Sequence, residues 1–209
     1  MIKPIILIGA GGHARVLIDA LKILKRKIAG ATDINPNKID SKRLGCQVLG
    51  TDDIIFRYSP NKIELVNGVG SIQVDPLRAT LFKKFKDRGY TFANIVHPYS
   101  YVSSTVILGE GVQILAGAIV QTGSVILTNS IINTNSSVDH DCRIGEHSHI
   151  SPAVTLCGDV EIGAGSHVGV GAIVVNGVVL KPGSFIKAGS LVTKKFTYGL
   201  SSRNKDLIK

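Results

Sequence analysis

The residues with the most chemistry to offer lie in one stretch, NTNSSVDHDCRIGEHSHIS, at residues 133–151. It contains His140, His147, His149, Cys142, Asp139, Asp141 and Glu146. Imidazole, thiolate and carboxylate groups are zinc ligands, and a histidine beside a carboxylate is also a common general base. Which chemistry applies depends on which side chains point the same way, and therefore on the elements that carry them.

A period of six residues runs through the C-terminal half, from Ile95 to residue 196, as seventeen hexads without an insertion. The second position is Val, Leu or Ile in every hexad, and the sixth is Ser, Val, Ala or Cys in all but the last. The fifth is Gly in eight hexads and Asn or Asp in four more, residues that tolerate the positive φ of a tight turn. Each hexad therefore predicts one short strand and one turn, with aliphatic side chains stacked inside a solenoid.

The first 94 residues predict a small α/β domain. We expect strands at 5–8 and 28–32, a third apolar stretch at 63–71, a basic helix at 77–88 and a short strand at 90–95. An amphipathic helix should begin near His13, because apolar residues follow at helical spacing: Val16, Leu17, Ala20, Leu21 and Leu24. This amounts to about half of a dinucleotide fold, which favours a mononucleotide or a sugar nucleotide over NAD.

The loop Gly9-Ala10-Gly11-Gly12 joins the first strand to this helix. Its backbone N–H groups would lie at the helix N-terminus, which is a ready anion site. Asp33 follows Gly9 by 24 residues, close to the ~20 expected for an acidic residue that reaches a ribose hydroxyl. Ala14 replaces the last glycine of the dinucleotide fingerprint, so NAD-dependent oxidoreduction is poorly supported.

The hexad phase resembles the left-handed parallel β-helix of the hexapeptide-repeat acyltransferases, in which three hexads make one coil. A G-x-G-G-H loop ahead of a solenoid with DHDC and HSHIS resembles one family more closely, over nearly the whole chain. This is the NeuD-like family of sialic acid O-acetyltransferases and UDP-4-amino-sugar N-acetyltransferases. The resemblance implies three parts: a nucleotide-sugar-binding domain at 1–94, the β-helix at 95–196 and a basic tail at 197–209. It also implies a homotrimer with active sites in the clefts between neighbouring subunits.

The hexad phase sorts the side chains of the opening stretch. Second and sixth positions point inward, which places in the core Val138, Ile144, Ile150 and Cys142. The remaining positions face outward or lie on turns, which applies to His140, Asp141, His147 and His149. His140 and His149 are nine residues apart, half a coil, so they lie on different sides. Zinc needs ligands that converge at about 2.0–2.3 Å, so we expect no metal site within one chain.

The resemblance implies roles for the outward residues. His140 matches the general base and Asp141 the acid that orients it, with Asp139 as the alternative. His149 would lie near the acetyl group of acetyl-CoA in a neighbour's cleft, and Asn133 would line the sugar site. His167 stacks one coil above His149, either as cleft wall or as surface decoration, and His147 is expected to be solvated.

Further site residues also follow from the resemblance. The nucleotide sugar would contact Gly11, Gly12, His13, Asp33 and Gly70. Acetyl-CoA would lie in a groove between adjacent solenoids, along Gly158, Val170, Ala188 and Gly189. Its phosphates could meet Lys187, Lys194 and Lys195, or these lysines form only a basic solenoid end.

Composition narrows the partners. No apolar run reaches the ~18 residues of a membrane span, and no signal peptide is expected. Three scattered cysteines indicate a cytoplasmic protein. The net charge of +9 favours an anionic partner, and basic clusters without interleaved aromatic residues favour phosphorylated ligands over nucleic acid.

These observations together predict an acetyl-CoA-dependent N-acetyltransferase without a metal. It would acetylate the amine of a nucleotide-activated 4-amino sugar in bacterial surface-glycan biosynthesis. One alternative is an O-acetyltransferase of a sialic-acid-like sugar. Another, from a different class, is a non-catalytic solenoid that binds sugar nucleotides, against which the His140–Asp141 pair argues.

Overall fold

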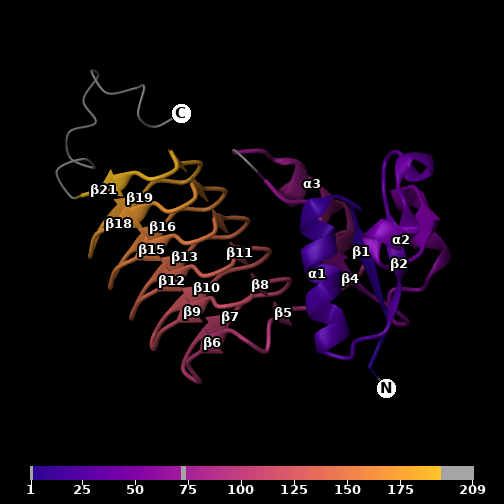
Figure 1. Ribbon diagram of the computed structural model, residues 1–209, viewed down its shortest axis with the longest axis horizontal. Helices are drawn as coiled ribbons and strands as arrows, with labels where there is room; N and C mark the ends of the chain where they lie inside the picture. The colour runs from indigo at the N-terminus through magenta and orange to yellow at the C-terminus, as the bar shows by residue number, and fades with distance from the viewer. Residues whose placement is uncertain (1, 72–73, 194–209) are drawn as a thin grey trace. The chain divides into compact units, whose positions relative to one another are not determined.

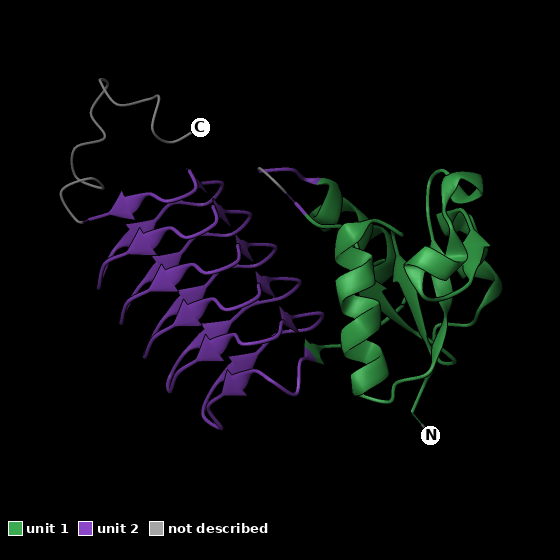
Figure 2. Ribbon diagram, in the orientation of Figure 1, with its two compact units in different colours: residues 1–70, 77–95 green, residues 71–76, 96–209 purple. Residues whose placement is uncertain are grey.

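The computed structural model describes residues 2–71 and 74–193 (Figure 1). The chain divides into two compact units, one formed by residues 1–70 and 77–95, the other by residues 71–76 and 96–209 (Figure 2). The predicted tail at 197–209, and with it Lys194 and Lys195, lies outside the described residues. No helix in the described ranges is both long and apolar enough to cross a membrane.

The first unit is built on a parallel sheet of four strands in the order β3-β2-β1-β4. The strands are β1 (Ile5–Ile8), β2 (Ile28–Thr32), β3 (Val48–Gly50) and β4 (Glu64–Asn67). The helices are α1 (Gly12–Ile23), α2 (Ser41–Leu44) and α3 (Leu77–Lys86), with 3₁₀ turns η1 (Pro36–Lys38) and η2 (Asp52–Arg57). All four residues of β1 are buried, as expected for an inner strand of a parallel sheet.

The sequence predicted the main elements of this unit and misjudged the short ones. β1 and β2 have the predicted bounds, and α1 and α3 lie where helices were expected. The predicted strand at 90–95 is wrong, because residues 90–94 form a single bridge, from Phe92 to Leu65, and Ile95 begins a separate strand. Val16 is 46% exposed although it was placed on the apolar face of α1. α2 and β3 are too short to show a period and were not predicted.

The second unit is a parallel β-helix of two-residue strands that begin six residues apart (Figure 1). The strands are β5 (Ile95–Val96), β6 (Tyr101–Val102), β7 (Ile107–Leu108), β8 (Gln113–Ile114), β9 (Ile119–Val120), β10 (Val125–Ile126), β11 (Ile131–Ile132), β12 (Ser137–Val138), β13 (Arg143–Ile144), β14 (His149–Ile150), β15 (Thr155–Leu156), β16 (Glu161–Ile162), β17 (His167–Val168), β18 (Ile173–Val174), β19 (Val179–Leu180), β20 (Phe185–Ile186) and β21 (Leu191–Val192). Each pairs with the third strand along the chain, as Val125 does with Arg143, so one coil takes 18 residues. Three sheets result, with the orders β19-β16-β13-β10-β7, β20-β17-β14-β11-β8-β5 and β21-β18-β15-β12-β9-β6.

The hexad positions have the predicted orientations. Second-position side chains form one buried core, and the four residues expected inside are buried: Val138, Cys142, Ile144 and Ile150. Every fifth position from Gly111 to Gly189 has a φ between 55° and 73°, in the left-handed region. The six that are not glycine include Asp141 and His147. The repeat therefore predicted the coil, its core and its turns.

Candidate active site

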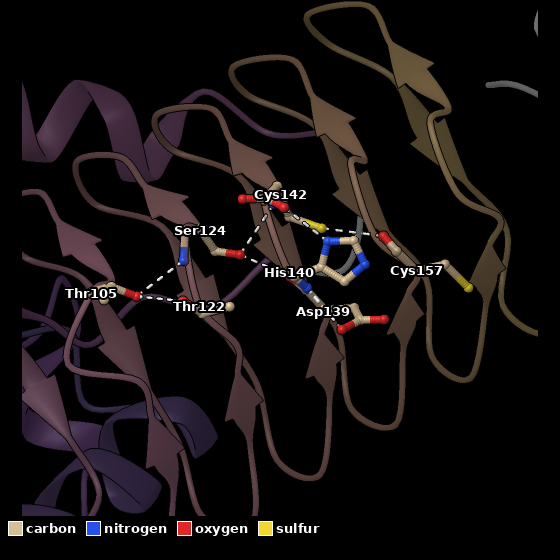
Figure 3. Close-up of polar contacts among 9 residues, drawn as sticks. Thr105, Thr122, Ser124, Asp139, His140, Cys142 and Cys157 are labelled. Carbon is tan, nitrogen blue, oxygen red and sulfur yellow. Dashed lines mark hydrogen bonds and ion pairs between the residues drawn. The ribbon is translucent and has the colours of Figure 1, made fainter.

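The turn between β12 and β13 carries Asp139, His140 and Asp141 of the DHDC motif, the first two of which are labelled in Figure 3. Nδ1 of His140 lies 2.9 Å from Oδ2 of Asp141, and the two side chains are 52% and 65% exposed. Asp139 instead accepts a hydrogen bond from the backbone N–H of His140, at 2.8 Å. Of the two acidic neighbours, Asp141 therefore contacts the ring and Asp139 the backbone. With Nδ1 donating to a carboxylate, Nε2 of the neutral ring is the proton acceptor.

The charges around this ring raise the pKa of His140. The hydrogen bond to Asp141 is the largest cause, followed by the negative charge of Asp139, with smaller effects of the charges of Asp141 and Asp159. A carboxylate that accepts from the imidazole stabilises its protonated form. The pair thus makes His140 a stronger base than an isolated imidazole.

Hydrogen bonds from the preceding coil hold this turn in place. Ser124 Oγ donates to the backbone oxygen of Asp139 at 2.8 Å and accepts from the N–H of Cys142 at 3.1 Å. Ser124 is fully buried, so it fastens both ends of the turn that carries the pair (Figure 3). Sequence reasoning missed this role, because a serine at the sixth position reads as one more small residue.

A second polar cluster surrounds His149 on β14. Its Nε2 lies 2.9 Å from Nδ2 of Asn133, and its Nδ1 lies 2.9 Å from Oγ and 3.1 Å from the backbone oxygen of Ser71. A carbonyl only accepts, so Nδ1 carries the proton and Nε2 accepts from Asn133. His149 has the outward position predicted for it, but it is only 7% exposed. The outward face is covered at this point, in part by Ser71, 78 residues away in sequence.

His167 extends this cluster by one coil. It pairs in register with His149, and the two rings meet edge to face with centroids 4.9 Å apart. Burial lowers its pKa, and Ser151 Oγ lies 3.2 Å from its Nε2. It is therefore buried rather than a surface decoration. His147 lies on a turn as expected, with Nδ1 2.9 Å from Nδ2 of Asn129.

The residues matched to acetyl-CoA fall on three turns, which follow β15, β17 and β20. Val170, Ala188 and Gly189 follow β17 and β20 of the same sheet, and the N–H of Gly189 donates to the backbone oxygen of Val170 at 2.8 Å. Lys187 is exposed beside them. Gly158 lies instead on the turn after β15, one coil above His140. The structure groups the first three and places Gly158 with the histidine.

The glycine loop of the first unit opens onto two cavities. One, of about 260 Å³, is lined by Gly11 and Gly12 together with Arg15, Lys38 and Arg43. A Cβ on either glycine would meet nothing within 4 Å, so the loop is open to a ligand. Amide groups at a helix N-terminus beside cationic side chains suit a phosphate.

The second cavity, of about 440 Å³, lies at the carboxyl ends of the parallel strands. Its lining includes Asp33, Asp52, Asp53 and Lys84, of which only Asp33 was predicted. It adjoins the point between β1 and β4 where the strand order reverses, the usual ligand crevice of such sheets.

Among the predicted nucleotide contacts, Asp33 lines this cavity, whereas Gly11 and Gly12 line the smaller one. Asp33 Oδ2 accepts from the N–H of Ala10 at 3.1 Å, so the carboxylate also supports the glycine loop. Gly70 packs on His13, because a Cβ on Gly70 would lie 3.1 Å from the Cβ of His13.

The described residues contain no group of three or more His, Cys, Asp and Glu placed to hold a metal ion. All three cysteines are free thiols, and burial raises the pKa of Cys142 to about 11. Such a thiol stays protonated at neutral pH and is a poor ligand or nucleophile.

A β-helix of hexads with a histidine–aspartate pair on an exposed turn defines a hexapeptide-repeat acyltransferase. The PglD N-terminal domain family matches residues 4–85. PerB from Caulobacter crescentus, solved with CoA and GDP-perosamine, is 36% identical, with 92% of this chain and 90% of that chain covered and a TM-score of 0.84. A histidine-to-asparagine mutant of this perosamine N-acetyltransferase is 35% identical over the same shares, with a TM-score of 0.85.

A third structure is the acetyltransferase domain of PglB from Neisseria gonorrhoeae in complex with acetyl coenzyme A. It is 28% identical, with 92% of this chain and 93% of that chain covered and a TM-score of 0.83. No curated protein matches the chain. The chain belongs to the hexapeptide-repeat N-acetyltransferase family that includes perosamine N-acetyltransferase. The family inferred from the motifs is thereby confirmed.

Proposed function

We propose that this protein transfers the acetyl group of acetyl-CoA to the amine of a nucleotide-activated 4-amino sugar, a precursor of a bacterial surface glycan. The observation that carries the proposal is the contact of His140 with Asp141 on an exposed turn. One relative, perosamine N-acetyltransferase from Caulobacter crescentus, was crystallised with CoA and GDP-perosamine both without a mutation and as a mutant, which supports this class of substrates.

The residues of the pair supply the proton transfers. The amine nitrogen attacks the thioester carbonyl, and Nε2 of His140 takes the proton that the nitrogen loses. The C–S bond then breaks as the amide forms, and the imidazolium returns its proton to the departing thiolate of CoA. Asp141 holds the ring and stabilises the imidazolium in between.

The substrates would be bound by separate sets of residues. The nucleotide would occupy the cavities beside the glycine loop, with contacts to Gly11, Gly12, His13, Asp33 and Gly70. Acetyl-CoA would lie along Gly158, Val170, Ala188 and Gly189, with His149 near its acetyl group and Asn133 lining the sugar site. Lys187 remains a candidate for a CoA phosphate.

We further propose that the protein is a homotrimer with active sites between neighbouring β-helices. One sheet supports this, because four of its six strands expose an apolar side chain on the outward face, with Ser137 and Thr155 between them: Tyr101, Ile119, Ile173 and Leu191. Exposed apolar side chains gathered on one face often mark a contact with a partner. A cytoplasmic location stays a prediction.

The test is release of CoA thiol from acetyl-CoA with a panel of GDP- and UDP-linked amino sugars, beside a free sialic acid. We expect turnover on an amino sugar and a fall of about 10²–10⁴ in kcat for His140→Ala. His147→Ala is the matched control, since His147 lies one hexad further on and should leave kcat unchanged. Turnover on the sialic acid alone would indicate the O-acetyltransferase. No turnover on any acceptor would indicate the non-catalytic solenoid.

A further inference from the structure

Gly158 departs from the pattern of its hexad position. Among the seventeen hexads, it is the one glycine at the fourth position, where the other sixteen residues carry a side chain. Its φ lies outside the left-handed region. The turn itself therefore does not require a glycine at residue 158.

The space beside Gly158 is occupied by the ring of His140, 18 residues earlier and one coil below. A Cβ on Gly158 would lie 2.5 Å from Cε1 and 3.1 Å from Cδ2 of that ring, and would collide with Nε2. Real Cβ atoms do not approach other atoms within 3.0 Å. The imidazole can keep its observed place only if residue 158 has no side chain.

The carboxylate of Asp141 likewise lies over a glycine of the preceding coil, Gly123. A Cβ on Gly123 would collide with Oδ1 of Asp141 and lie 3.3 Å from its Cγ. Gly123 has a φ of 73°, however, so a substitution there would add backbone strain. Gly158 is the cleaner place to test whether empty space positions the pair.

We propose that Gly158 is a positioning residue, whose missing side chain forms the seat that keeps the His140 imidazole on Asp141. This goes beyond a backbone contact with acetyl-CoA, since the seat exists without any ligand. It rests on the proposed role of His140 as the base. A ring displaced by about 1 Å can lose roughly 10²-fold in rate, which is why such a seat matters.

The experiment is Gly158→Ala, with Ala164→Gly as the control at the fourth position of the next hexad. The His140 ring is titrated by NMR in the absence of acetyl-CoA. Displacement from Asp141 should lower its pKa toward the ordinary value, while the charges of Asp139 and Asp159 remain. We expect kcat to fall roughly 10- to 100-fold, with a smaller effect on the KM for acetyl-CoA. The control should change neither the pKa of His140 nor kcat.

An unchanged His140 pKa in folded Gly158→Ala overturns the proposal, as does a rise in KM for acetyl-CoA alone. If the variant unfolds, its loss of thermal stability is measured again in a His140→Ala background. If Gly158 makes room for the imidazole, the loss of stability should largely disappear in the His140→Ala background. An equal loss in both backgrounds overturns the proposal. Because the titration needs no turnover, it can succeed even if His140→Ala retains activity and the proposed function fails.

Discussion

Nδ1 of His140 lies 2.9 Å from Oδ2 of Asp141, the next residue in the chain. Successive side chains of an extended strand point to opposite faces and cannot meet in this way. Here the two residues occupy the fourth and fifth hexad positions, and Asp141 has a φ of 60°. The tight turn therefore brings the side chains of two consecutive residues together on an exposed corner of the coil.

Asp141→Asn should shift the pH dependence of catalysis. A general base acts when unprotonated, and Asp141 raises the pKa of His140. The variant should therefore have a lower His140 pKa, and its kcat/KM should begin to fall with decreasing pH at a lower pH than that of the wild type. Its maximal kcat should fall by at least about tenfold, since the imidazolium is less stabilised. A pH profile of kcat/KM measures the shift, and kcat at saturating substrates measures the fall. Asp139→Asn is the control and should shift the limb less, so a larger shift in the control would make Asp139 the orienting acid.

Ser124→Ala should lower both stability and activity, whereas the same change at a matched serine, Ser130, should lower stability alone. Ser130 is equally buried on another corner, where it donates to the backbone oxygen of Gly145 and accepts from the N–H of Ser148. Either alanine leaves buried backbone groups without a partner, which costs about 1–3 kcal/mol in the free energy of unfolding. Only Ser124→Ala should also lower kcat, because only Ser124 holds the turn of His140. Equal kcat values in the two variants would contradict this role.

Asp33→Ala should weaken binding of the nucleotide sugar specifically. It removes the acceptor of the Ala10 N–H and one wall of the larger cavity. We expect the KM for the nucleotide sugar to rise by about tenfold, equivalent to roughly 1.4 kcal/mol, with the KM for acetyl-CoA unchanged. Asp87→Ala, which removes an exposed carboxylate paired with Lys83, is the control. A change in the acetyl-CoA KM alone would place Asp33 in a different role.

Ile173→Glu should dissociate the proposed trimer. The residue is 44% exposed on the outward face of the sheet that contains β18, and a carboxylate buried there would be strongly unfavourable. Sedimentation velocity should show a monomer without loss of the β-helix by circular dichroism. Val179→Glu makes the same change on another sheet, where the residue is 56% exposed. A monomer from Val179→Glu instead would place the interface on that sheet.

Much of the fold followed from one regular period. Aliphatic residues six apart can all be buried only if the chain turns once per hexad, so the core, the turns and the inward place of Cys142 were predictable. The strand expected at 90–95 failed because a short apolar run has no period, and tertiary contact left a single bridge at Phe92. The burial of His149 is due in part to Ser71, a contact across 78 residues that no local pattern contains.

The repeat, the pairing of a glycine-loop domain with a β-helix, and the adjacency of His140 and Asp141 could all be predicted, since each is a matter of spacing along the chain. The folded structure was needed to find that Asp141 rather than Asp139 contacts the ring, that Ser124 holds its turn, and that the ring lies over Gly158. These depend on rotamers and on stacking between coils, where ångström differences separate a contact from a collision. Spacing places residues on the same corner, but packing decides which atoms meet there.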